Sequence, residues 1–172
     1  MSVKQFSAVY APIEDRIIFG FNTTEDELYS FILTRAIASS FLDQAETTVE
    51  QSLSSEHSER SSKLISEFQK EGLKKQLNFE VSFEGGQITP LGKEPILVTQ
   101  VHLDLKPDNV AISLTLLSNQ VVGFSLLAVQ LQALTLLLEK LARQACWKIG
   151  SDDSAANEAQ ILVDLPVASQ LH

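Results

Sequence analysis

The sequence predicts an α+β fold, in which an antiparallel β-sheet carries helices packed on one face. Short segments of alternating apolar and polar residues, typical of half-buried strands, occupy the start and the middle of the chain. Two longer segments, one near residue 30 and one from Leu126, repeat apolar residues at helical spacing. The expected order of elements is β-β-α-(α)-β-β-β-β-α, where the parenthesis marks a segment that is either a helix or a connector.

The chain begins with a predicted β-hairpin. Phe6, Ala8 and Tyr10 alternate on one face of the first strand, and apolar residues alternate again on the return strand, residues 17–21. Residues 12–15 between them are turn formers. Both strands are therefore expected to turn one apolar face toward a common core.

A helix is expected to begin near Glu25. The stretch Thr24-Glu25-Asp26-Glu27 fits a capping box, and its acids complement the positive end of a helix dipole. The apolar residues between Leu28 and Leu42 give this helix a wide apolar face. Residues 43–62 are rich in Ser, Thr, Glu and Gln, so we interpret them either as a solvent-facing helical extension or as a connector. Helical periodicity returns at residues 64–68.

Four more strands are expected before the last helix. Residues 79–83 alternate and lead to Gly85-Gly86, a tight-turn signal. A long strand over residues 96–106 and a partner over residues 110–116 are joined by a Pro-Asp-Asn turn. A further turn at residues 118–120 leads into a strand that ends at Phe124. The sequence shows no internal repeat.

The last helix is expected to begin after a Ser125 cap and to end near Trp147. Its leucines fall at alternating spacings of four and three, and further apolar residues widen the stripe. A helix that is apolar nearly all round is either deeply buried or shared between subunits. We therefore predict a homo-oligomer, most simply a two-fold dimer. The predicted interface residues are Leu127, Leu131, Leu134, Leu138 and Leu141.

Length and composition favour one domain, residues 1–149, followed by an acidic, loosely ordered tail, residues 150–172. The net charge is −9, from 22 acidic against 13 basic residues, which disfavours nucleic acid and anionic membranes as partners. No apolar run approaches the ~20 residues of a membrane span. A single cysteine and an N-terminus without a signal-peptide pattern favour the cytoplasm.

The segment H-L-D-L-K-P-D-N, from His102 to Asn109, is similar to the catalytic loop of protein kinases. That loop needs a Gly-rich loop over ATP before it and a D-F-G segment shortly after it. The chain has no G-x-G-x-x-G pattern before His102. It also lacks D-F-G, because the next aspartate after Asp108 is Asp152. We conclude that the chain is not a protein kinase and that the segment is a strand running into a turn.

Other residues with chemical potential are also better explained by structure. His102 and Asp104 share a strand face, but no further His or Cys has ligand spacing, so a polar outer sheet face is favoured over a metal site. The His57 segment lacks the second histidine of a zinc motif. Cys146 has no apparent His partner, so we expect a small packed residue. The sequence therefore predicts no catalytic residue, metal or cofactor.

Arg35 lies within an apolar helical run, where a charge must be paired or must reach the surface. Two interpretations stay open: a structural bridge to a carboxylate, with Asp15 close in sequence, or an arginine that binds a ligand. In the second interpretation, the pocket would lie between sheet and helices near Arg35, Tyr10 and His102.

Several segments together resemble a family of small uncharacterised bacterial proteins. They are E-D-R-I-I-F-G-F-N-T at Glu14 to Thr23, L-T-R at Leu33 to Arg35, P-L-G-K-E-P-I-L-V at Pro90 to Val98, and a final helix ending at Trp147. The resemblance implies a shared fold and supplies no catalytic residue. The family pattern has a second basic residue after L-T-R, where this chain has Ala36.

Two functions follow as hypotheses. The leading one is a non-enzymatic cytoplasmic interaction module that self-associates through its C-terminal Leu-rich helix. The alternative is a small-molecule binding protein or weakly marked enzyme with a pocket between sheet and helices. A deep pocket with convergent polar groups would favour the alternative.

Overall fold

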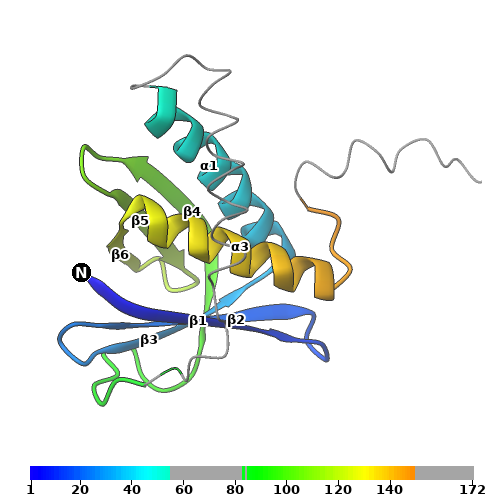
Figure 1. The fold of residues 1–172 in the computed structure, drawn as a ribbon. Helices are drawn as coiled ribbons and strands as arrows, with labels where there is room; N and C mark the ends of the chain where they lie inside the picture. The colour runs from blue at the N-terminus through cyan, green and yellow to red at the C-terminus, as the bar shows by residue number, and fades with distance from the viewer. Residues whose placement is uncertain (55–82, 84, 150–172) are drawn as a thin grey trace, which may run out of the picture.

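The computed structural model describes residues 1–54, 83 and 85–149 of the 172-residue chain. One six-stranded sheet, in the order β1-β2-β3-β4-β5-β6, and two helices make up this part of the fold (Figure 1). The elements are β1 (Val3–Ala11), β2 (Arg16–Thr23), β3 (Leu28–Leu33), α1 (Arg35–Ser54), β4 (Ile96–Leu105), β5 (Val110–Leu116), β6 (Val121–Leu126) and α3 (Ala128–Gln144). The predicted α+β class with a mostly antiparallel sheet is confirmed.

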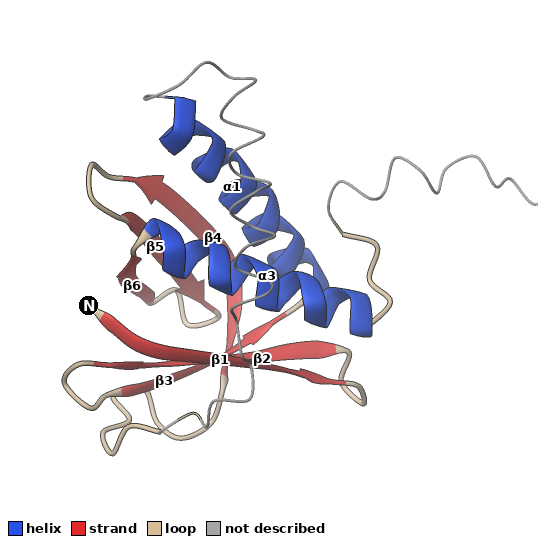
Figure 2. Cartoon of the chain, in the orientation of Figure 1, coloured by secondary structure: helices blue, strands red, loops and turns tan. Residues whose placement is uncertain are grey.

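The sheet consists of two antiparallel three-stranded parts, β1–β3 and β4–β6, which are bent toward each other with both helices on the inner side (Figure 2). A short parallel pairing joins the two parts, with Phe31 opposite Ile96 and Ile32 opposite Leu97. At the other end of the sheet, Ser2 and Ser125 form a parallel bridge. The sheet therefore curls until its first and last strands meet.

The expected helix near Glu25 is wrong, because residues 28–33 form strand β3. The capping-box residues instead form the β2–β3 turn, in which Asp26 adopts a left-handed conformation (φ 63°). The Thr23 hydroxyl accepts hydrogen bonds from the backbone N–H groups of Glu25 and Glu27 at 3.3 and 3.4 Å. Alternate β3 residues, among them Tyr29 and Phe31, are buried against the core. The apolar residues in 28–33 fit both the helical period and the strand period, and pairing with β2 selects the strand.

Helix α1 begins at Arg35, where the Thr34 hydroxyl accepts a hydrogen bond from the Ile37 N–H at 3.4 Å. It runs through Ser54, so the first part of the polar stretch 43–62 is a helical extension. The predicted helical segment 64–68 and the tail 150–172 lie outside the described residues, as do residues 79–82 of the predicted strand 79–83.

Ser125 does not cap the last helix, since it is part of strand β6. Helix α3 has Leu127 at its N-cap, and the Gln130 Oε1 atom accepts a hydrogen bond from the Leu127 N–H at 2.9 Å. The helix ends at Gln144, before Trp147. Each three-stranded part of the sheet is thus followed directly by one helix, and the described order is β-β-β-α-β-β-β-α.

An aromatic cluster lies at the centre of the core. The rings of Phe21 and Phe124, which belong to different halves of the sheet, have centroids 4.5 Å apart. Phe19 and Phe31 extend the cluster, with centroids 6.3 Å apart. This cluster joins the two bent parts of the sheet beneath the helices.

Candidate functional site

Asp15, in the β1–β2 turn, is the centre of a polar cluster that joins distant parts of the described chain. Its Oδ1 atom accepts one hydrogen bond from the Tyr10 hydroxyl at 2.7 Å and a second from the Trp147 Nε1–H at 2.8 Å. Asp15 has φ 50°, a conformation that Asp tolerates better than most residues. Tyr10 reaches it from the inner face of β1, near the end of that strand.

The end of helix α3 delivers Trp147 to this cluster. The backbone N–H of Trp147 donates to the Ala142 carbonyl at 2.8 Å, and the backbone N–H of Cys146 donates to the Arg143 carbonyl at 3.0 Å. Together with the left-handed Cys146 (φ 56°), these bonds form a Schellman motif, which reverses the chain at a helix end. Trp147 is 6% exposed, and its ring meets the Tyr10 ring edge-on, at a centroid distance of 5.9 Å.

Hydrogen bonds set the ionisation of this cluster. The bonds from Tyr10 and then Trp147 lower the pKa of Asp15, partial desolvation opposes them, and the charge of Arg35 adds to the lowering. The pKa of Tyr10 is raised, chiefly because its hydroxyl donates to the Asp15 carboxylate. Both shifts stabilise a negative Asp15 beside a neutral Tyr10, which suits a structural contact better than proton transfer.

The stability that ionised Asp15 contributes is expected to depend on pH. Because the pKa of Asp15 is lowered by folding, this contribution is fully present above the ordinary value of 3.8 and is lost as pH falls through the lower folded value. Urea unfolding should show that the native chain has a higher free energy of unfolding than Asp15→Asn at pH 7. This difference between the two proteins should become smaller below pH 3.8. Glu14→Gln, in the same turn, is the control, and a difference that does not change with pH would contradict this role.

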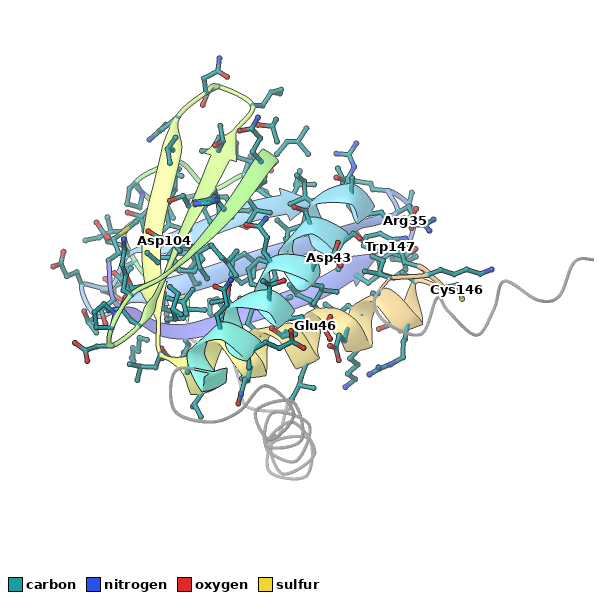
Figure 3. All side chains as sticks on the ribbon, turned by 90° about the horizontal axis from the view of Figure 1, so that it is seen from above. Arg35, Asp43, Glu46, Asp104, Cys146 and Trp147 are labelled. Atoms are coloured by element: carbon teal, nitrogen blue, oxygen red, sulfur yellow. The ribbon has the colours of Figure 1, made fainter. Side chains whose placement is uncertain are left out.

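Arg35 lies at the same end of the molecule as Trp147 and Cys146, and its side chain is exposed (Figure 3). Its charge acts on Asp15, but among the described residues no ion pair joins Arg35 to a carboxylate. The predicted bridge is therefore replaced by a longer-range attraction. An exposed guanidinium at the first residue of α1 reaches water directly, so it needs no buried partner.

His102 is not brought together with Tyr10 and Arg35. It is exposed on β4, opposite Ser113, on the face that also carries Asp104, whereas Val101 and Leu103 face α1. Figure 3 shows Asp104 on the opposite side of the molecule from Arg35 and Trp147. Hydrogen bonding to Lys106 lowers the pKa of Asp104. Within the described ranges, no group of three or more His, Cys, Asp or Glu side chains is placed to hold a metal ion.

A cavity of about 10 Å³ lies between the sheet and the helices, where the predicted pocket was placed. That volume has room for about one water molecule. All of its lining residues are apolar, and none of the three predicted ligand-binding residues is among them. The lining residues are Phe19, Leu33, Ile37, Phe41, Val101, Leu114, Phe124, Leu134 and Leu138. Such a cavity is a gap in core packing and offers a ligand no polar anchor.

Four of the five predicted interface leucines lie in the interior of the single chain. They are Leu131, Leu134, Leu138 and Leu141. A partner subunit cannot reach these side chains without opening the fold, so they are core residues. Leu127 is 57% exposed, as are Val129 at 59% and Met1 at 46%. The Ser125 N–H binds the Met1 carbonyl at 3.2 Å, which brings the start of the chain next to the start of α3.

Comparison of the chain with protein-family models, with curated proteins and with solved structures gives no match. The resemblance to small bacterial proteins thus gains no support from these comparisons. In the part of the chain that the structure describes, no helix is both long enough and apolar enough to cross a membrane. The fold and the Asp15 cluster define an α+β protein with a polar cluster that links two distant segments of the chain.

Proposed function

We propose that this protein is a non-enzymatic interaction module that self-associates, and that a second copy binds at the exposed start of α3. The supporting observation is that Met1, Leu127 and Val129 are exposed and that the Ser125–Met1 backbone hydrogen bond brings the start of the chain next to the start of α3; we call these three residues the α3-start patch. Exposed apolar residues that gather at one place on a surface are typical of contact sites. The single cysteine is consistent with action in the cytoplasm.

Apolar burial would have to supply the free energy of this association. Each copy carries a net charge of −9, so two copies repel each other at long range. Covering a Leu or Val side chain contributes on the order of 1.5–3 kcal/mol when burial is complete. Two copies that meet through equivalent α3-start patches would cover at least four such side chains.

The alternative, a small-molecule site, has weaker support. The polar groups of Tyr10 and Trp147 are both bound to Asp15, which leaves neither donor directed at an open cavity. The apolar cavity between sheet and helices would need a substantial opening to admit any ligand larger than water.

The double substitution Leu127→Glu with Val129→Glu is expected to convert the assembly to single chains. Both side chains are exposed, so the fold should be retained while carboxylates oppose apolar contact. Light scattering after size exclusion gives the mass, and circular dichroism checks the fold. Ile13→Glu, at a fully exposed isoleucine in the β1–β2 turn, is the matched control and should leave the mass of the assembly unchanged. Equal masses for all three proteins would contradict the assignment of the α3-start patch.

A further inference from the structure

The two halves of the described chain share one hydrogen-bonding plan. Strand β2 pairs with β3 from Ile17 opposite Leu33 to Asn22 opposite Leu28. Strand β5 pairs with β6 from Val110 opposite Leu126 to Thr115 opposite Val121. If the difference between residue numbers 110 and 17 is added to both members of a β2–β3 pair, the result is always a β5–β6 pair. The two hairpins therefore have the same register throughout.

The turns of these hairpins are also the same. Asp26 (φ 63°) and Asn119 (φ 64°) are related by that same difference in residue number, and both are left-handed. The Thr23 N–H binds the Glu27 carbonyl at 2.9 Å, and the Leu116 N–H binds the Gln120 carbonyl at 2.8 Å. Left-handed non-glycine residues are uncommon, so their coincidence within identical turns indicates a repeated structure.

The first strand of each half carries the same irregularity. The β1–β2 register shifts between Val3 and Gln5, and the β4–β5 register shifts between Val98 and Gln100. Both valines are buried. Bulges re-aim a strand and are specific features of a fold, so a bulge at the same place in both halves supports one common plan.

The two junctions between the halves are equivalent as well. The end of β3 pairs in parallel with the start of β4 at Ile32 and Leu97. The end of β6 pairs in parallel with the start of the chain at Ser125 and Ser2. These two contacts exchange places when the halves are exchanged, as expected for an approximate two-fold relation.

Every described position that is buried in α1 is also buried in α3, which has further buried positions, and each helix packs against the other half. The buried residues of α1 are Ala38, Phe41, Leu42, Ala45 and Thr48, and their equivalents in α3 are Leu131, Leu134, Thr135, Leu138 and Leu141. Helix α1 lies along β4, where the Gln44 side chain donates to the Val101 carbonyl and accepts from the Leu103 N–H. Helix α3 contacts β1. Each helix therefore packs mainly on the strands of the other half.

We infer that the chain is a fused pair of βββα units related by an approximate two-fold axis, and that the face between them is an interaction surface whose partner is a second βββα unit. The first unit is β1 to α1 and the second is β4 to α3. Since the surfaces are complementary, the first unit of one copy can pair with the second unit of another. This inference uses the face between the units and is independent of the α3-start patch.

Complementation between two damaged full-length chains tests this inference. Phe31 and Phe124 are equivalent and buried, and Phe31→Asp or Phe124→Asp should each unfold one unit and leave the chain insoluble when expressed alone. Co-expression with different affinity tags should give a soluble complex, in which the intact second unit of the Phe31→Asp chain pairs with the intact first unit of the Phe124→Asp chain. The complex should contain the two tags in equal amounts and should unfold in a single transition.

The matched control pairs Phe31→Asp with Phe19→Asp, both in the first unit, and should stay insoluble. Refolding the two purified variants together from urea repeats the test without co-expression. The inference is overturned if the Phe31→Asp and Phe124→Asp chains yield no soluble complex by either route. It is also overturned if the control pair is rescued equally well, because the rescue would then not depend on complementary units.

Discussion

Replacing Phe21 with alanine is expected to lower the free energy of unfolding by about 3–5 kcal/mol. Phe21 is fully buried, and its ring lies among Phe124, Tyr29 and Phe31, with centroids 4.5, 5.1 and 5.9 Å away. Removing the ring takes away the contact that joins the two halves of the sheet and leaves a cavity that rigid neighbours cannot fill. Urea unfolding followed by circular dichroism measures the change.

The control for Phe21→Ala is Val121→Ala, at an exposed position on β6. This change should stay within about 0.5 kcal/mol of the native chain. A Phe21→Ala protein as stable as the control would contradict the packing of the two halves through the aromatic cluster.

Replacing Trp147 with alanine is expected to cost about 3–5 kcal/mol. The indole is buried, packs edge-on against Tyr10, and donates to Asp15 from a position 132 residues further along the chain. Its loss would free the end of α3 from the β1–β2 turn. Circular dichroism is the appropriate signal, because Trp147 is the only tryptophan.

The Trp147→Phe variant separates packing from hydrogen bonding. It keeps part of the ring contact and loses the indole N–H, so it should cost roughly 1–3 kcal/mol, less than Trp147→Ala. Equal losses for the two variants would show that ring packing against Tyr10 contributes nothing.

The strands were predictable where local chemistry and periodicity agree. Apolar and polar residues alternate in residues 96–106 and 110–116, and the Pro-Asp-Asn segment between them favours a turn. Both strands and their pairing therefore follow from the sequence. Residues 24–33 were predicted to be a helix and instead form a turn and a strand, because their sequence is compatible with both structures. An S/T-x-x-E pattern starts a helix or occupies a turn, and Leu28 to Leu33 is apolar at both periods.

The Asp15 cluster was only partly predictable. The chemistry of Tyr10 and Arg35 favours a ligand-binding role, and both residues act on Asp15, but no local signal in the sequence connects Asp15 to Trp147. The repeat escaped the sequence because the two units share burial and register more than residue identity. Phe19 corresponds to Ile112, and Ala38 corresponds to Leu131.

The Leu-rich helix was predicted to need a partner subunit because a single flat sheet covers only one side of a helix. The bent sheet and α1 give α3 more contact than a flat sheet would, which accounts for the burial of Leu131, Leu134 and Leu138 within one chain. What stays exposed is the start of the helix, at Leu127 and Val129. The proposed contact between copies is therefore smaller and lies at one end of the predicted stripe.

Sedimentation equilibrium of the unmodified protein over a range of micromolar concentrations tests self-association most directly. We expect a mass that rises with concentration to twice the 19.0 kDa of one chain. A mass of 19.0 kDa at every concentration, for a protein that is folded by circular dichroism, would contradict it.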